Sequence, residues 1–283
     1  IRYFMDFTLK NIDIPVSDTA LKLFMKPSIH ILGTSLTGLA KEGALKIREV
    51  VLNHTEGYDA AEFKHGPNTI LGKNTIYSLT DMELLLGNMI EMFEQLFDKG
   101  FLKGNGAKAD MVREYTNTVK NLKFRKVDDD TVIKPFTSKE DRNAMKKMYS
   151  LFAEKTGIEN FFSNYPLVFV CPPDERDKRI TISQIHTHKI RGADIVLISE
   201  DDDDLKKAAT GKPASTGKYW SKFIELPRTG DRNIFIFEAA VVLQLLAFKM
   251  SVAKMKYLNR SQIENHGVHP DVPKNVSKSI TVD

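Results

Sequence analysis

Short apolar runs alternate with longer amphipathic stretches at both ends of the chain. Four runs have the length and the bulky side chains of buried β-strands, at 28–33, 167–171, 195–199 and 223–226. Apolar residues at helical spacing predict helices at 17–25, 39–52, 174–191 and 233–257. Strands and helices that alternate in this way are typical of a parallel sheet covered on both faces. The sequence therefore predicts an α/β fold, with about five parallel strands in a flavodoxin-like order and right-handed crossovers.

The middle of the chain follows a different pattern. It contains three amphipathic stretches, at 81–99, 107–122 and 138–155, separated by glycines and by an acidic run at 128–130. This pattern predicts a helical insertion into the α/β domain. The predicted organisation is an N-terminal linker helix at 1–27, a first part of the α/β domain at 28–72, the insertion at 73–163, and a second part with a C-terminal tail at 164–283.

Composition and charge exclude several classes of protein. The 283 residues include 41 Lys and Arg against 37 Asp and Glu, and a net charge of +4 is too small and too scattered to favour a nucleic-acid partner. Apolar residues at 42% and charged residues at 28% exclude wholesale disorder. The single cysteine, Cys171, excludes an intramolecular disulfide and a multi-cysteine zinc site. It lies in an apolar strand, where we expect an inert core thiol, and it fits a reducing, cytoplasmic compartment.

No segment of the sequence is expected to cross a membrane. The most apolar stretch, 234–248, contains Glu238 and Gln244. It is shorter than the roughly 18 apolar residues that a spanning helix needs, so we predict a buried core helix. The N-terminus has no signal-peptide pattern, and because the chain begins with Ile rather than Met we expect it to be part of a longer polypeptide.

The segment 40–67 contains the residues best suited to chemistry. Glu42, Lys46 and Glu49 are spaced at i, i+4 and i+7, so on a helix they share one face. An acid–base–acid stripe at the mouth of an α/β sheet could relay protons, and the alternative is a surface ion-pair ladder. His65 lies in the sequence EFKHGP, where we predict a rigid turn that holds the imidazole in place. Histidine is the natural acid or base near neutral pH.

Hydroxyl groups and further histidines complete the set of candidate groups. Thr34, Ser35 and Thr37 precede the helix at 39–52, where they could bind an anion or cap the helix, and we favour capping. We expect His30 to be buried and hydrogen-bonded within a strand. His186 and His188 should lie on different faces of a helix, so we expect no metal site there. We interpret the acidic run at 200–204 as a solvated loop.

Two motifs and the C-terminal tail resemble one enzyme family. KEGALKIRE, followed by HTEGYDAAEFKHGP, resembles the second sugar-isomerase (SIS) domain of the glutamine–fructose-6-phosphate aminotransferases (isomerizing), where the pattern is close to LEGALKLKE and HAEGYPAGELKHGP. LQLLAFKMSVAK and DVPKNVSKSITVD resemble the last helix and the C-terminal tail of that family. The resemblance covers 28–72 and 165–283 in family order, and 73–163 has no counterpart.

The resemblance implies roles for five residues. Glu49 matches the residue that moves a proton between C1 and C2 of the sugar, with Glu42 and Lys46 as supporting groups on the same helix. His65 matches the histidine that assists ring opening in the neighbouring subunit. Lys278 matches the tail lysine that contacts the sugar as an imine with its carbonyl. The resemblance also implies fructose 6-phosphate as substrate, glucosamine 6-phosphate as product, a homodimer, no cofactor, and ammonia from a glutaminase domain that this chain does not contain.

Two departures from the family pattern keep other functions open. The chain has LGTSLTG where the second domain of the family usually has LGRG, so Thr34, Ser35 and Thr37 resemble the hydroxyl-rich turn of the first SIS domain instead. The Ser-x-Ser-Gly-[Asp/Glu]-Thr loop that holds the sugar phosphate in the family is not found in this sequence. The alternatives are a non-catalytic SIS module that binds a phosphosugar for regulation, and a sugar-phosphate isomerase or deaminase that uses free ammonia.

Overall fold

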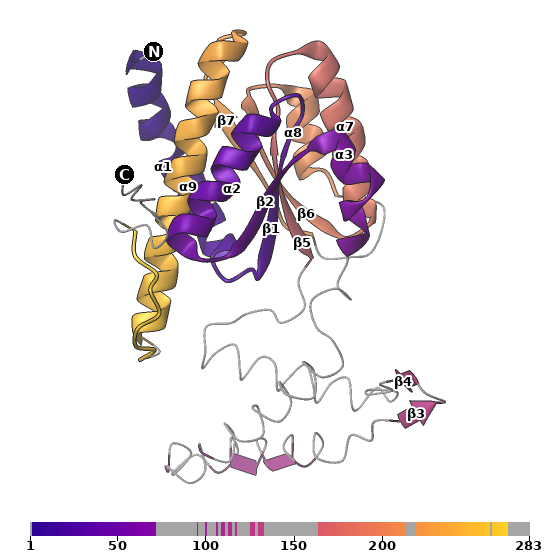
Figure 1. Ribbon diagram of the computed structural model, residues 1–283, viewed down its shortest axis with the longest axis vertical. Helices are drawn as coiled ribbons and strands as arrows, with labels where there is room; N and C mark the ends of the chain where they lie inside the picture. The colour runs from indigo at the N-terminus through magenta and orange to yellow at the C-terminus, as the bar shows by residue number, and fades with distance from the viewer. Residues whose placement is uncertain are drawn as a thin grey trace, which may run out of the picture. The chain divides into compact units, whose positions relative to one another are not determined.

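Five parallel strands form the central sheet of the protein, which we describe from a computed structural model (Figure 1). The structure describes residues 2–71, 164–212, 219–260 and 262–270, together with isolated positions and one hairpin between 73 and 163. The strands are β1 (Ser28–Gly33), β2 (His54–Asp59), β5 (Tyr165–Val170), β6 (Ala193–Glu200) and β7 (Ser221–Leu226). Their order, β2-β1-β5-β6-β7, is the flavodoxin-like order, so the predicted α/β fold is confirmed.

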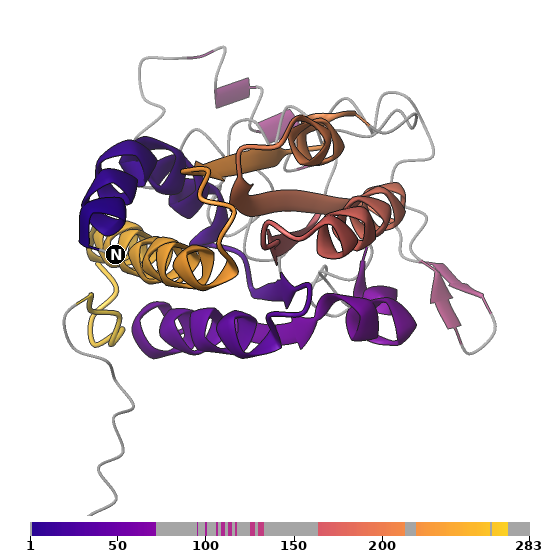
Figure 2. The same cartoon turned by 90° about the horizontal axis from the view of Figure 1, so that it is seen from above.

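Helices cover both faces of this sheet (Figure 2). The helical elements are α1 (Arg2–Leu23), α2 (Thr37–Val51), α3 (Ala60–His65), the 3₁₀ helix η1 (Pro67–Ile70), α7 (Glu175–Ile190), α8 (Asp203–Thr210) and α9 (Arg232–Arg260). Buried side chains of α1, α2 and α9 pack on one face, and those of α3, α7 and α8 pack on the other. The loops that follow β1 and β5 lead to opposite faces, which makes the carboxyl ends of these two strands the switch point of the sheet.

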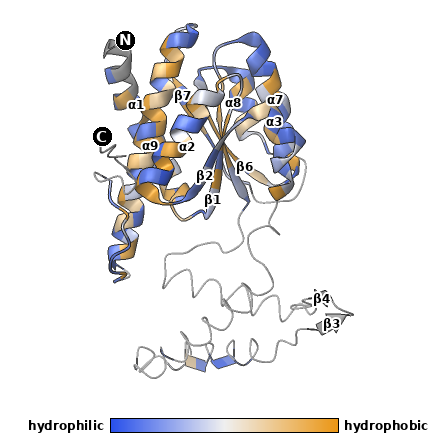
Figure 3. Ribbon diagram, in the orientation of Figure 1, coloured by the Kyte–Doolittle hydropathy of each residue, from blue (hydrophilic) through white to orange (hydrophobic). Residues whose placement is uncertain are grey.

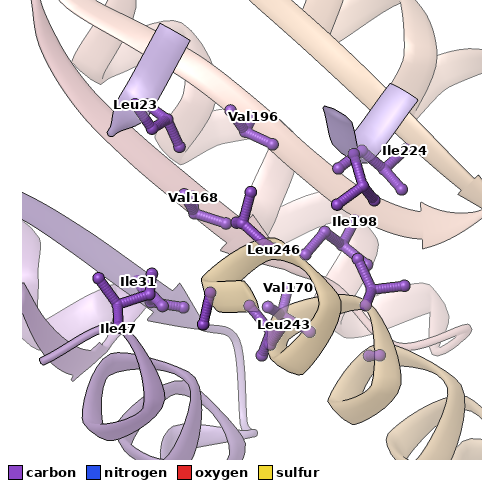
Figure 4. Close-up of a cluster of buried hydrophobic side chains, with 14 of the residues drawn as sticks. Leu23, Ile31, Ile47, Val168, Val170, Val196, Ile198, Ile224, Leu243 and Leu246 are labelled. Carbon is purple, nitrogen blue, oxygen red and sulfur yellow. The ribbon is translucent and has the colours of Figure 1, made fainter. Parts of the chain in front are cut away.

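The buried faces of the strands supply the core. The central strands carry mostly hydrophobic residues (Figure 3), because a parallel strand covered on both faces has no side that meets water. Figure 4 shows Ile31, Val168 and Val196 from neighbouring strands against Leu243 and Leu246 of α9. By length and composition α9 could cross a membrane, but half of its most apolar window is buried inside the protein, as in a core helix.

The chain divides into two compact units, one made of 1–72 with 164–283 and the other of 73–163. In the second unit, β3 (Arg125–Val127) and β4 (Asp130–Val132) pair as an antiparallel hairpin that the sequence did not predict. The three amphipathic helices predicted for this unit lie largely outside the described residues.

The N-terminal helix differs from its prediction. The apolar spacing predicted a helix only at 17–25, but α1 begins at Arg2 and continues through Pro15. Buried side chains on its inner face, Val16 and Leu23 among them, belong to the main core, and their burial keeps the helix continuous despite the proline.

The motif HTEGYDAAEFKHGP also folds differently from its prediction. Its first six residues form β2, which pairs in register with β1, from Ser28 opposite His54 to Gly33 opposite Asp59. Asp59 then caps α3 by accepting hydrogen bonds from the backbone nitrogens of Ala61 and Glu62. His65 is therefore the last residue of a short helix rather than part of a rigid turn. The hydrophobic pattern did not predict β2, because β2 is a polar strand at the edge of the sheet.

A buried lysine donates hydrogen bonds to backbone carbonyls at the end of α8, and its loss should destabilise the fold. Lys189 Nζ donates to the carbonyl oxygens of Ala208, Ala209 and Gly211, at 2.7 Å for the first and the last. Burial lowers its pKa to about 8. We expect Lys189→Met to reduce the free energy of unfolding by about 2 kcal/mol, because three carbonyls lose their donor. Urea denaturation measures the loss. Lys206→Met, which removes an exposed ion pair with Glu225 and a cation–π contact with Phe223, should change stability by less than about 1 kcal/mol. Equal effects of the two substitutions would contradict this role.

Candidate functional site

Glu42, Lys46 and Glu49 form a continuous ion-pair ladder on the outer face of α2. Lys46 Nζ lies 3.5 Å from a carboxylate oxygen of Glu42 and 3.2 Å from one of Glu49. The hydrogen bond to Glu49 raises the pKa of Lys46, and burial opposes this shift only in part. Glu49 is the least exposed of the three, with 21% of its side chain accessible against 44% for Glu42. The predicted common face is confirmed, and the lysine holds the less exposed carboxylate in a fixed orientation.

His65 and Lys278 are not joined to this ladder by any contact that the structure describes. His65 is exposed at the end of α3, on the other face of the sheet from α2. Among the described residues no hydrogen bond or ion pair connects it to Glu42, Lys46 or Glu49. Lys278 lies in the tail beyond 270, outside the described residues.

The three hydroxyl residues of the β1–α2 turn bind other parts of the fold instead of capping α2. Thr34 Oγ1 lies 2.6 Å from Thr181 Oγ1 of α7, and Thr37 Oγ1 donates to an Asp59 carboxylate oxygen at 3.4 Å. The N-cap position of α2 is Leu36, and no side chain caps this helix. The capping interpretation is therefore wrong, because distant parts of the chain supply better partners for these hydroxyls.

Ser35 belongs to a polar cluster at the carboxyl edge of the sheet. Its hydroxyl donates to the Asp177 carboxylate of α7 and accepts from an Arg232 guanidinium nitrogen at 2.8 Å. That guanidinium also donates to the Ser35 carbonyl at 2.9 Å and lies 3.3 Å from Asp177. Ser35 adopts a left-handed backbone conformation, with φ of 56°, which the cluster holds in place.

Sequence reasoning did not select Asp177 or Arg232. The available signal was their position, because each lies in the first turn of a helix that follows a strand, and such turns gather at the carboxyl edge of a parallel sheet. Spacing along the chain could not pair them, since 55 residues separate the two.

Two open hollows lie beside these elements. The first, about 400 Å³, lies between α2 and β2, and Lys41, Arg48, Glu56, Asp59 and Glu62 give it charges of both signs. Thr37 and Tyr58 also line it. The second, about 420 Å³, lies between α3 and α7 and includes His65. In the described part of the chain no group of three metal-ligating side chains gathers at either place.

The buried titratable groups are consistent with their predicted places in the core. His30 is 4% exposed, and its Nδ1 lies 2.7 Å from the Tyr165 hydroxyl, as expected for a hydrogen-bonded core histidine. His188 is fully buried whereas His186 is exposed, which confirms that they occupy different faces of α7. Cys171 is buried, and desolvation raises its pKa to about 12, so the thiol carries little nucleophilic thiolate at neutral pH.

His188 and His30 are expected to weaken the fold in acid. Burial lowers the pKa of each imidazole to about 4, against about 6.5 in the unfolded chain. The unfolded chain therefore binds more protons between these values, so stability falls as the pH decreases from about 6.5 and levels off below about 4. We expect each histidine to cost about 3 kcal/mol across this window.

The substitution His188→Leu isolates one half of this effect. Neither ring nitrogen of His188 has a partner, and the ring packs against Phe63 and Phe169, so an apolar side chain of similar size fits its surroundings. Urea denaturation should show the variant within about 1 kcal/mol of the parent at pH 7 and more stable by about 3 kcal/mol at pH 4. A parallel loss of stability in both proteins would show that His188 does not contribute.

Comparisons with known proteins find partial relatives. No family model matches the chain. A 93-residue segment is 43% identical to glutamine–fructose-6-phosphate aminotransferase [isomerizing] of Sulfolobus acidocaldarius, covering 31% of this chain and 14% of that protein. The same enzyme of Clostridium perfringens is 32% identical over 94 residues, covering 32% and 15%. The form 2 enzyme of Mus musculus is 38% identical over 64 residues, covering 22% and 9%.

A solved structure is also similar to this chain. The C-terminal domain of glucosamine-fructose-6-phosphate aminotransferase from Francisella tularensis matches with a TM-score of 0.47 and 18% identity, over 90% of this chain and 43% of that one. The matched segments span about one seventh of the length of the first two curated relatives, at 14% and 15%. The resemblance carried by the motifs is thus confirmed: part of this chain is similar in sequence to the glutamine–fructose-6-phosphate aminotransferases [isomerizing].

Proposed function

We propose that the chain is the isomerase half of a glutamine-dependent fructose-6-phosphate aminotransferase that makes glucosamine 6-phosphate. The observation that carries this proposal is the arrangement on α2, where Lys46 orients Glu49 within a motif typical of that family. A carboxylate fixed by an ammonium and only partly exposed is suited to move a proton between adjacent carbons of a bound sugar.

The reaction assigns separate steps to separate residues. The sugar ring opens with the help of His65 from the neighbouring subunit, which exposes the C2 carbonyl. Lys278 forms an imine with this carbonyl, and its oxygen leaves as water. Ammonia then replaces the lysine nitrogen on C2. Glu49 takes a proton from C1 and returns it to C2, while the C1 hydroxyl proton passes to the imine nitrogen, which gives the 2-amino aldose. Lys46 positions the Glu49 carboxylate through their ion pair, and Glu42 contacts the same lysine from the preceding turn.

The remaining assignments follow from the same proposal. The unit 73–163 is an insertion between the two parts of the SIS domain, 28–72 and 164–283. In the same proposal Ser35 and Thr37 contact the sugar from the start of α2, in exchange for their present hydrogen bonds within the fold. Thr34 is 4% exposed and contacts Thr181, so it would act from behind the turn. The enzyme is a cytoplasmic homodimer, and its ammonia comes from a glutaminase domain outside this chain.

An assay of the whole protein tests the proposal. We expect glucosamine 6-phosphate to form from fructose 6-phosphate when glutamine is the nitrogen source. Calorimetric binding of fructose 6-phosphate or glucose 6-phosphate without any turnover would overturn this activity in favour of a regulatory phosphosugar-binding module. Turnover that needs ammonium and does not respond to glutamine would identify an ammonia-using isomerase or deaminase instead.

A further inference from the structure

The hollow between α3 and α7 differs from the first hollow in its charge. Its lining contains Lys64, His65 and Arg179, and no aspartate or glutamate. In the first hollow, by contrast, the carboxylates of β2 and α3 offset the cations of α2. In the described part of the chain neither Lys64 Nζ nor the Arg179 guanidinium has a carboxylate within ion-pair distance. Two uncompensated cations at one concave place favour an anionic ligand.

A buried amide adds a second recognition group to this hollow. Gln184 lines it from α7 and is 4% exposed, yet its carbonyl oxygen has no hydrogen-bond partner. A buried acceptor without a donor is costly, so a donor from outside the protein would stabilise it. Ser183 lines the same hollow with a hydroxyl that can donate or accept. The lining thus combines cations for an anion with an acceptor for a ligand hydroxyl.

We infer that this hollow binds a small phosphate ester that carries hydroxyl groups. Arg179, whose planar guanidinium can donate two parallel bonds, and Lys64 contact the phosphate, and the Gln184 carbonyl accepts from a hydroxyl of the ligand. The volume of about 420 Å³ suffices for a molecule of the size of a hexose phosphate. All its lining residues lie on one face of the sheet within one chain, and neither Glu49 nor Lys278 is among them. His65 is the one residue that this hollow shares with the proposed active site.

Phosphate binding to the 283-residue chain tests the ionic part of the site. Isothermal titration calorimetry at constant ionic strength uses inorganic phosphate as probe and acetate as a comparison anion. We expect phosphate to bind and acetate to bind at least tenfold more weakly. Arg179→Gln should raise the Kd for phosphate roughly tenfold, as loss of a charge-assisted contact implies. Arg191→Gln is the matched control, because it removes the same charge from the exposed far end of α7 and should leave the Kd within about twofold.

The amide is tested with a hydroxyl-bearing probe. Glucose 6-phosphate should bind more tightly than inorganic phosphate to the parent chain. Gln184→Leu should remove this difference and leave phosphate binding unchanged. The inference fails if the parent binds no phosphate, if Arg191→Gln weakens binding as much as Arg179→Gln, or if the preference for glucose 6-phosphate survives in Gln184→Leu.

The outcome can be separated from that of the proposed activity. Phosphate binding is measured without turnover, and Glu49→Gln should leave it unchanged because Glu49 lies on α2, across the sheet from this hollow. Turnover by the whole protein together with no phosphate binding in the hollow would overturn the binding site alone. Binding in the hollow together with no turnover would overturn the activity alone.

Discussion

Glu49→Gln is expected to lower kcat for glucosamine 6-phosphate formation by the whole protein about a thousandfold. The substitution keeps the size of the side chain and its ability to accept the hydrogen bond from Lys46, which lies 3.2 Å away. It removes the negative charge of the side chain and with it the capacity to take up and return a proton. KM for fructose 6-phosphate should stay within about threefold, because the loss affects a step made in the transition state rather than substrate binding.

The same helix provides a control for this experiment. Glu42→Gln also removes one carboxylate from the ladder, but Glu42 has 44% of its side chain exposed and contacts Lys46 at 3.5 Å. We expect it to lower kcat about tenfold at most, since it acts on Glu49 only through the lysine. Similar losses in both variants would indicate a general electrostatic effect. A Glu49→Gln enzyme that retains its kcat would contradict the assignment of the proton-transfer role.

Much of the fold could be predicted from the sequence because the central strands and their helices carry local signals. β1, β5 and β6 are buried on both faces, so each is an apolar run, whereas β7 is an edge strand with a shorter apolar segment. The structure places all four strands within two residues of their predicted bounds. The start of α7 was also marked locally, because Asp174 accepts hydrogen bonds from Arg176 and Asp177 as its N-cap. β2 has no such apolar run. It is a strand because it pairs with β1, and a local pattern cannot predict this pairing.

Only the part of the candidate site that lies on one helix could be predicted from the sequence, because only that part has a local signal. The contacts of Lys46 with Glu42 and Glu49 join successive turns of one helix, so the spacing of these residues alone predicts them. The partner of Ser35, in contrast, is 142 residues away along the chain, and that of Thr34 is 147 residues away. No local pattern records contacts across such separations, which is why helix capping was the wrong interpretation of these hydroxyls.

Gly57→Val is expected to reduce the free energy of unfolding by about 3 kcal/mol or more. Gly57 lies in β2 where that strand meets α2, and a Cβ atom there would lie 2.4 Å from the Lys41 backbone nitrogen and 2.5 Å from the Ala40 carbonyl oxygen. Because these are backbone atoms, the contact cannot be relieved by a rotamer change, and α2 and β2 have to separate. Urea denaturation of the 283-residue chain measures the loss.

Gly66→Ala is the matched control for this substitution. A Cβ at Gly66 meets nothing within 4 Å, so we expect a change below about 1 kcal/mol. If Gly57→Val unfolds at the same urea concentration as the parent, the close approach of β2 and α2 is wrong. Because α2 carries Glu49, separating the two elements should lower turnover of the whole protein together with its stability, whereas Glu49→Gln lowers turnover alone. The pair of variants therefore distinguishes a carboxylate that performs chemistry from a backbone contact that holds it in place.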